Sequence, residues 1–378
     1  MKKLFVIGNG FDSAHDLPTS YDHFRKFLCD TYLNGRTVED CMPMIPTVSV
    51  GPKGEDILDM ERVAEFLVYI ISEAEPDGSK WSDLEASLGK LDYDEAFEFL
   101  PEERDRDGDI NYWRVSNNNA DMASDLYKVI SSVKDLFSEW VDTIEINDTE
   151  QKDDFNNLVG AEDIFLTFNY TYTLEDVYGI DERNVCHIHG EQGGDILFGH
   201  GNTEDYSSQY MNKHIGSENS LSMLDMILKK DTVKALNEHL DFFDNIDASI
   251  KEVYSIGFSF ADVDLIYIKE ICKRLSVDTV WFLNDYNSDD IPKFQKRLRE
   301  CGFKGKFDVF HINDPNWEIP EYSKKQIDKA GKIISSLNEI ELKDINNAKT
   351  VLNNWRSSHA YPLHIIAGNL RRNNPKAI

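Results

Sequence analysis

The chain has 378 residues, of which 41% are hydrophobic and 11% aromatic, and its net charge is −29, from 69 acidic and 40 basic residues. This composition is sufficient for a packed core and excludes a wholly disordered chain. A surface this negative repels a phosphate backbone over roughly a Debye length of about 10 Å, so duplex nucleic acid is not expected as a partner.

The same composition predicts a cytoplasmic protein without membrane contact. The longest apolar runs, such as 66–71, are too short to span a bilayer, and the N-terminus lacks the apolar segment and cleavage site of a signal peptide. The cysteines are odd in number and form no C-x-x-C pair; they stand at positions 29, 41, 186, 272 and 301. We therefore expect reduced thiols and no metal.

The predicted elements begin with a buried strand at 4–7 and a helix at 19–33. About 120 residues without a convincing strand follow. Helices are predicted there at 56–74, 81–100 and 121–144, the last from an apolar stripe with helical spacing.

From residue 163 onward, predicted strands alternate with helices. The strands are expected at 163–168, 184–188, 196–198, 252–256, 279–283 and 307–311. The helices are expected at 220–245, 262–274, 289–300 and through much of 322–356.

Most of the predicted strands are apolar throughout, which is typical of parallel strands covered by helices on both faces. The element order predicts an α/β fold: a Rossmann-like, doubly wound parallel sheet with a large helical insertion and a helical C-terminal tail. We predict a discontinuous sheet domain at 1–33 and 151–315, a helical insertion at 34–150 and a helical extension at 316–378.

The first strand runs directly into Gly8-Asn9-Gly10. Ligands of open α/β sheets bind beyond the carboxyl ends of the strands. Two glycines would let the backbone come close to a ligand, and the N–H groups of the loop would suit a pyrophosphate. Ser13 stands where a dinucleotide-binding fingerprint has its third glycine. A nucleotide loop and a merely tight turn therefore both remain open.

Three more polar segments follow predicted strands, at 166–175, 186–194 and 255–264. They place chemically useful residues at the same edge of the sheet: Thr167, Asn169, Tyr170, His189, Gly257 and Ser259. Asp262 and Asp264 follow in the first turn of a helix, where their simplest role is to complement the helix N-terminus.

Together these segments resemble the AbiH family of bacterial phage abortive-infection proteins. The resemblance covers residues 4 to about 312 and is carried by an ordered string of motifs. These are "LFVIGNGFDSAHDLPTSY" (4–21), "WSDLE" (81–85), "TFNYT" (167–171), "HIHG" (187–190), "FGHGN" (198–202) and "IGFSFADVD" (256–264).

The same blocks are similar, more distantly, to the sirtuin-like NAD-binding domain. Gly8-Asn9-Gly10 corresponds to its G-A-G loop, 167–171 to its T-x-N-Y-D segment, His189-Gly190 to its H-G pair, 257–259 to its G-x-S segment and Asn284 to the asparagine ending a later strand. Asn9 and Thr171 depart from that pattern, and the four zinc-binding cysteines of deacetylating sirtuins are absent. The resemblance thus points to anti-phage proteins that hydrolyse NAD.

This resemblance implies an NAD+ glycohydrolase that releases nicotinamide and ADP-ribose. It implies Asn169 and His189 as catalytic residues. The residues implied to bind NAD are Gly8, Asn9, Gly10, Phe11, Asp12, Thr167, Tyr170, Gly257, Phe258, Ser259 and Asn284. An amide can hold the ribose or a water, and a histidine suits a general base. The simpler roles are a helix cap for Asn169 and a core residue for His189.

Three other interpretations stay open at this stage. His187 and His189 are two apart on a predicted strand, and with His200 they could bind a metal. A metal-dependent nuclease is a second possibility, with carboxylates for two ions from Asp12, Asp262 and Asp264. The third is a nucleotide sensor that binds without turnover.

Uncontrolled loss of NAD would kill the cell, so activity must be restrained. We expect a homo-oligomer that responds to a phage-derived trigger. Occlusion of the pocket by the helical insertion or by oligomer contacts is a natural device for this.

Overall fold

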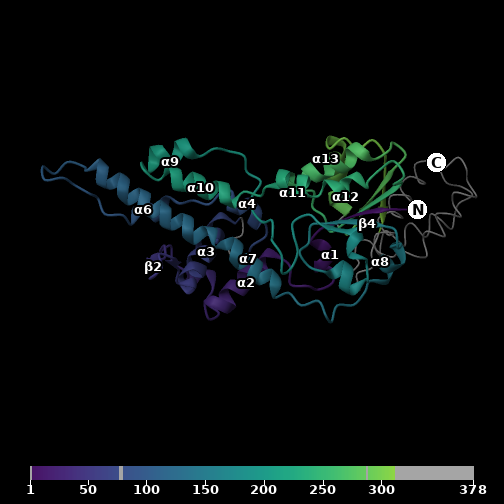
Figure 1. Cartoon of the computed structure of the whole chain (residues 1–378), viewed down its shortest axis with the longest axis horizontal. Coiled ribbons are helices and arrows are strands. Elements are labelled where there is room, and N and C mark those ends of the chain that lie inside the picture. Colours follow the sequence, from purple (N-terminus) through teal and green to yellow (C-terminus); the bar gives the residue numbers. More distant parts are fainter. Residues whose placement is uncertain (1, 76–79, 287, 311–378) are drawn as a thin grey trace, which may run out of the picture.

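The molecule is elongated, with a largely helical unit at one end and a sheet with flanking helices at the other (Figure 1). The computed structural model describes residues 2–75, 80–286 and 288–310. The predicted extension at 316–378, with its helix through much of 322–356, lies outside the described residues.

Six parallel strands form the sheet, in the order β5-β4-β1-β6-β7-β8. They are β1 (Leu4–Ile7), β4 (Ile164–Thr167), β5 (Val185–His187), β6 (Glu252–Ile256), β7 (Val280–Asn284) and β8 (Lys306–Phe310). Ile7 at the end of β1 pairs with Thr167 of β4 and Ile256 of β6. The carboxyl ends of these three central strands therefore lie together, and the chain changes its direction of travel across the sheet between β1 and β6. This confirms the predicted α/β class and the parallel sheet.

A row of aromatic rings crosses one face of the sheet. Phe5 of β1 stacks on Phe165 of β4 and on Tyr254 of β6, with ring centroids 4.9 and 5.2 Å apart, and Tyr254 stacks on Phe282 of β7 at 4.6 Å. The in-register pairing of parallel strands brings these rings face to face. Helices α1 (Gly10–Ser13) and α8 (Asp153–Leu158) lie on this face. The Phe155 ring of α8 meets the Phe5 ring edge-on.

Helices on the opposite face bury the alternate strand residues Leu4 and Val6. They are α11 (Thr232–Glu238), α12 (Leu240–Asp244), α13 (Leu265–Arg274) and α14 (Ile291–Glu300). In Figure 1, α11 to α13 lie on one side of the sheet, and α1 and α8 lie on the other. Helices on both faces explain why the strands are apolar throughout.

The helical unit is built from two separate segments of the chain, 21–142 and 198–228. Its helices are α2 (Tyr21–Tyr32), α3 (Met60–Ala74), α4 (Leu84–Leu88), α5 (Asp94–Glu98), α6 (Tyr112–Ser131), α7 (Val133–Asp142), α9 (Ser207–Lys213) and α10 (Glu218–Leu228), beside the small hairpin β2 (Ser49–Val50) and β3 (Asp56–Ile57). Phe24 of α2 and Leu224 of α10 share its hydrophobic core. The predicted insertion at 34–150 contains neither helix. The domain ranges stay a prediction, but the core adds α2 and 198–228 to the helical unit.

Several predicted elements are shorter than expected, or absent. The helix expected at 81–100 divides into α4 and α5, because Gly89 packs against the 200–202 segment, where a Cβ on it would lie 3.1 Å from Asn202. Those expected at 121–144 and 220–245 also divide, into two and three helices. The strand expected at 196–198 was wrong, because Phe198 is buried in the helical core, stacked on Phe137 with ring centroids 3.9 Å apart.

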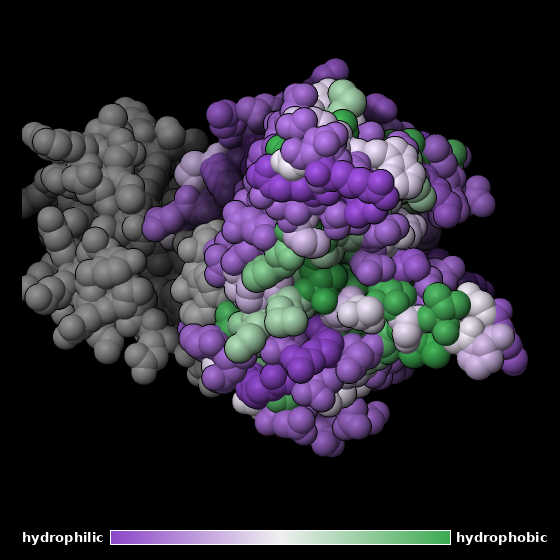
Figure 2. Space-filling view, turned by 90° about the vertical axis from the view of Figure 1, so that its left-hand side faces the viewer, coloured by the Kyte–Doolittle hydropathy of each residue, from purple (hydrophilic) through white to green (hydrophobic). Residues whose placement is uncertain are grey.

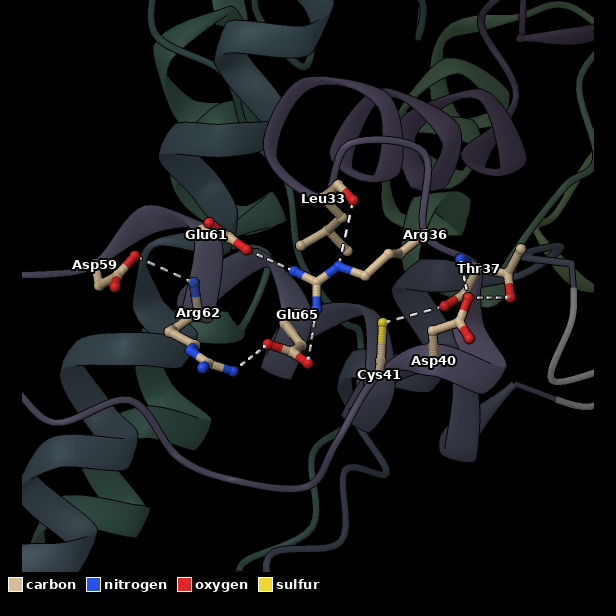
Figure 3. A network of polar contacts seen from close by, with 9 residues as sticks. All are labelled: Leu33, Arg36, Thr37, Asp40, Cys41, Asp59, Glu61, Arg62 and Glu65. Carbon is tan, nitrogen blue, oxygen red and sulfur yellow. Dashed lines mark hydrogen bonds and ion pairs between the residues drawn. The ribbon is translucent and has the colours of Figure 1, made fainter.

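Arg36 ties the loop after α2 to α3 (Figure 3). Its guanidinium lies 2.7 Å from Glu61 and 3.2 Å from Glu65, and it donates a hydrogen bond to the carbonyl of Leu33. Glu65 is buried, and its other carboxylate oxygen meets Arg62 at 2.9 Å. Two cations thus compensate one buried carboxylate, as burial of a charge requires.

The outer end of the helical unit exposes apolar side chains among hydrophilic ones, which appear as green areas in Figure 2. Elsewhere on the helical unit, Met226 near the end of α10 is 75% exposed, and Trp113 in the first turn of α6 is 74% exposed. In the part of the chain that the structure describes, no helix has the length and apolar character that crossing a membrane requires.

The ring row predicts that the central strand carries much of the stability of the sheet. We expect Phe5→Ala to lower the free energy of unfolding by about 3–5 kcal/mol, the usual cost of removing a buried phenylalanine. Phe307→Ala serves as the control, because this half-buried ring lies on the edge strand β8. Urea unfolding followed by circular dichroism measures both, and equal losses would contradict a central role for Phe5.

Candidate functional site

A cavity of about 790 Å³ lies at the carboxyl ends of β1, β4 and β6, between the sheet and the helical unit. Ten predicted site residues line it: Gly8, Asn9, Gly10, Asp12, Asn169, Tyr170, His189, Gly257, Phe258 and Ser259. The helical unit contributes Glu85 of α4 and Trp140 of α7. Segments far apart in the sequence therefore meet in one space.

Three predicted residues lie outside this cavity. Phe11 and Asn284 line a second cavity of about 360 Å³, whose wall also includes Gly10 and 257–259, so the two cavities adjoin. Thr167 is buried, and its hydroxyl accepts a hydrogen bond from the backbone N–H of Asn169 at 3.2 Å. Thr167 therefore does not line the cavity, and its side chain holds the backbone of Asn169 in place.

The glycine loop is packed against the end of β6. The N–H groups of Gly8 and Gly10 donate to the carbonyls of Ile256 and Gly257 at 2.9 and 3.0 Å. These two groups are therefore used within the protein, and the binding of a pyrophosphate by the loop stays a prediction. A Cβ on Gly10 would lie 2.6 Å from the Cα of Gly257. Glycine is required here by the contact of two backbones.

Asp12 forms a buried polar group with the segment after β4. Its side chain is 1% exposed, and one carboxylate oxygen accepts a hydrogen bond from the Thr171 hydroxyl at 2.6 Å. Burial raises the pKa of Asp12 to about 6, against the opposing effect of hydrogen bonds from Thr171, Thr173 and Asn169. Oδ1 of Asp12 and Oδ1 of Asn169 have no hydrogen-bond partner among the described residues.

His189 follows β5 and is 2% exposed, between the rings of Phe168 and Tyr267. Its Nε2 lies 3.2 Å from Oδ1 of Asp264, although the two atoms are not aligned as a hydrogen bond. Burial lowers the pKa of His189 to about 4, the Lys230 cation acts in the same direction, and Asp264 opposes both. The imidazole is therefore neutral at physiological pH.

Beside His189 lies a charged group that includes two residues not named as site residues from the sequence, Glu85 and Lys230. The ammonium of Lys230, which is 4% exposed, is 2.8 Å from Glu85 and 3.4 Å from Asp264. We refer to Glu85, Lys230, Asp264 and His189 as the charge cluster. Lys230 stands in no recognisable motif, and Glu85 ends the "WSDLE" segment, whose place among the ordered motifs was the only signal for it.

The metal interpretations find little support in this arrangement. His187 hydrogen bonds to Glu175 and to the carbonyl of Asn169, whereas His189 faces Asp264, so the two histidines have different environments. Asp262 is mostly exposed and pairs with Arg297 at 3.1 Å. Within the described ranges, no group of three or more His, Cys, Asp or Glu side chains is arranged to hold a metal ion.

The glycine contact predicts an unusually sensitive position. Gly257 has φ +62, and an added Cβ would lie 2.2 Å from the backbone nitrogen of Phe11. Gly179→Ala is the matched control, because Gly179 has φ +65 with nothing within 4 Å of its Cβ position. We expect the control to lose about 1–2 kcal/mol of stability and Gly257→Ala about 1–3 kcal/mol more. Denaturant unfolding would show equal losses if the contact were unimportant.

Burial of Asp12 predicts a pH-dependent cost. Folding raises the pKa of Asp12 from 3.8 to about 6, so the folded state binds this proton more tightly than the unfolded chain does. The free energy of unfolding is therefore highest below pH 3.8 and decreases as the pH rises through 6. Asp12→Asn should therefore be more stable than wild type by roughly 3 kcal/mol at pH 7, with no gain below pH 4. Urea unfolding across pH 4–8 measures this, with the exposed Asp30→Asn as the control. A gain independent of pH would rule out the titration of Asp12 as its cause.

Comparison with protein-family models gives one match, to bacteriophage abortive infection AbiH, over residues 4–285. The comparison with curated proteins found no match, and neither did the comparison with solved structures. The matched range includes β1, β4, β5, β6 and β7 together with the helical unit and the whole charge cluster. The chain therefore belongs to the bacteriophage abortive infection family AbiH, and its function is abortive infection of phage-infected cells.

Proposed function

We propose that the cavity binds NAD+ and hydrolyses its nicotinamide–ribose bond, as the effector step of abortive infection. The observation that carries this proposal is that Asn169 and His189, from the ends of two neighbouring strands, line the same cavity beside the glycine loop. In chain order the strands are arranged 3-2-1-4-5-6. This is the order of dinucleotide-binding Rossmann folds, which bind their ligand where the order reverses.

The size and lining of the two cavities support a dinucleotide. A volume of about 790 Å³ lies within the usual range of small-molecule sites, about 300–1,000 Å³. Aromatic side chains such as Phe137 and Trp140 line the larger cavity, and Asn284 lines the smaller one. In our proposal NAD spans both, with nicotinamide and its ribose near Asn169 and the adenosine ribose near Asn284.

The unpartnered polar atoms suit the chemistry of this bond. When the glycosidic bond breaks, its electron pair leaves with the nicotinamide nitrogen, and positive charge develops on the ribose. The carboxylate of Asp12 would stabilise that charge, and Asn169 would hold a ribose hydroxyl or the attacking water. The water oxygen then bonds to the ribose carbon, and its proton passes to the neutral His189.

A nucleotide sensor without turnover is the second candidate. A histidine with a pKa of about 4 is a weaker base than free histidine, which favours this alternative. The same cavity and the same residues would then bind the nucleotide, and the signal would be a conformational change. The two functions differ in one observable, the release of nicotinamide.

The test is to incubate purified protein with NAD, with and without phage lysate, and to assay free nicotinamide. We expect His189→Ala to bind NAD with little change in affinity while turnover falls ~10²-fold or more, because a base acts in the transition state. Asn169→Ala should weaken both binding and turnover, because it holds the ribose before and during bond cleavage. Calorimetry measures the binding.

His214→Ala is the control, because this histidine lies in the helical unit, stacked on Phe97 and bonded to Asp94. It should behave as wild type in the same activated state. Binding of NAD without any nicotinamide release would favour the sensor, and full activity of His189→Ala would remove the histidine from the mechanism.

A further inference from the structure

The charge cluster joins four segments of the chain at the cavity. Glu85 belongs to α4 of the helical unit, and Lys230 lies in the linker between α10 and α11. Asp264 ends the short helix η4 (Asp262–Asp264) before α13, and His189 follows β5. A continuous series of contacts, with distances of 2.8, 3.4 and 3.2 Å, therefore leads from the helical unit to the imidazole.

The backbone around the cluster is fixed by the 198–202 segment. The carbonyl of His200 accepts the N–H of Lys230 at 2.9 Å, and the side chain of Asn202 donates to the carbonyl of Gly89 at 2.9 Å. A Cβ on Gly201 would lie 2.7 Å from Val263 of η4. This segment is thus wedged between the end of α4 and η4, so the two units meet at the cluster.

We propose that Glu85 and Lys230 are positioning residues, which act through Asp264 to hold His189 for the reaction only while α4 is docked at the sheet. This inference rests on the proposed function for its kinetic consequence. In this proposal the position of the helical unit regulates the site, because it determines whether His189 is held where it can act as the base.

The electrostatics of the cluster explain how the coupling works. Lys230 is a buried cation between two carboxylates, and together with His189 it keeps the pKa of Asp264 below its ordinary value despite burial. An ionised Asp264 favours a proton on Nε2 of His189, which leaves Nδ1 with the free lone pair that a base needs. The other titratable groups acting on the cluster include Asp83, beside Glu85, and His239, which acts with Lys230 on His189. Three tyrosines also interact with it, because burial and then the charges of Glu85 and Asp264 raise their pKa values: Tyr21, Tyr170 and Tyr267.

Undocking of α4 would remove Glu85 from Lys230. The buried cation would then be compensated by Asp264 alone, and the loss of one partner from a buried ionic group is strongly unfavourable. Lys230 would move toward water or Asp264, and the Asp264–His189 contact would change with it. A trigger that shifts the helical unit therefore reaches the reaction centre through two side chains.

The test compares Lys230→Met and Glu85→Gln with wild type in two measurements. The pKa of His189 is followed by NMR of its ring C–H groups without NAD, and kcat and KM are measured for NAD. Glu65→Gln is the matched control, because this buried carboxylate of α3 pairs with Arg36 and Arg62, outside the cluster.

We expect Lys230→Met to raise the pKa of His189 by roughly one unit or more, because a nearby cation is removed. kcat should fall roughly tenfold or more in Lys230→Met and in Glu85→Gln, with KM changed less than about threefold. Glu65→Gln should change neither quantity. Where the single variant does not fold, Glu85→Gln/Lys230→Met removes both charges at once and should show the same rise in pKa.

An unchanged pKa of His189 in Lys230→Met and in the double variant overturns the positioning role. If the wild type releases nicotinamide and the kcat of Lys230→Met and Glu85→Gln equals the wild-type value, the positioning role is also overturned. If the wild type releases none in any state, the proposed function fails instead, and the pKa measurement alone decides whether the helical unit controls His189.

Discussion

The contact between the glycine loop and the end of β6 is the constraint on which the site depends. Gly8 and Gly10 meet Gly257 at a distance that leaves no room for a side chain, and two backbone hydrogen bonds join the segments. The contact joins the segments that follow the neighbouring strands β1 and β6, where the strand order reverses. It brings 257–259 and the loop onto the shared wall of both cavities. The glycines first satisfy packing, and any ligand must use the surface that this packing creates.

Around that wall the protein buries ionisable groups that oppose stability. Asp12 is held where its charge is disfavoured, and His189 is neutral because water is excluded and a lysine is near. Such groups are typical of functional sites, where shifted pKa values and unpartnered polar atoms are kept although they lower the stability of the fold. The helical unit takes part in this arrangement through Glu85, so it is a component of the site as well as a cover for it.

The sheet could be predicted because its strands are short apolar runs that end in glycine or polar residues, and β1 and β6 were placed to the residue. The residues at the strand ends that line the cavity, Asn169 and His189 among them, follow from parallel geometry alone. The extent of the helical unit could not be predicted, since α2 and α10 join its core through tertiary contacts that no local pattern records. Lys230 was missed for a similar reason. A single lysine after a helix is expected on the solvated surface, and only the fold shows that Glu85 and Asp264, distant in the sequence, surround it.

The central claim is that this AbiH protein acts by removing NAD from the infected cell. The most direct measurement is the NAD content of bacteria expressing wild-type protein or Asn169→Ala, followed through phage infection at matched protein levels. The account predicts that NAD falls sharply after infection in wild-type cells, with nicotinamide and ADP-ribose appearing together, and stays constant in cells with the variant. Abortive infection by the wild-type protein with an unchanged NAD content would contradict it.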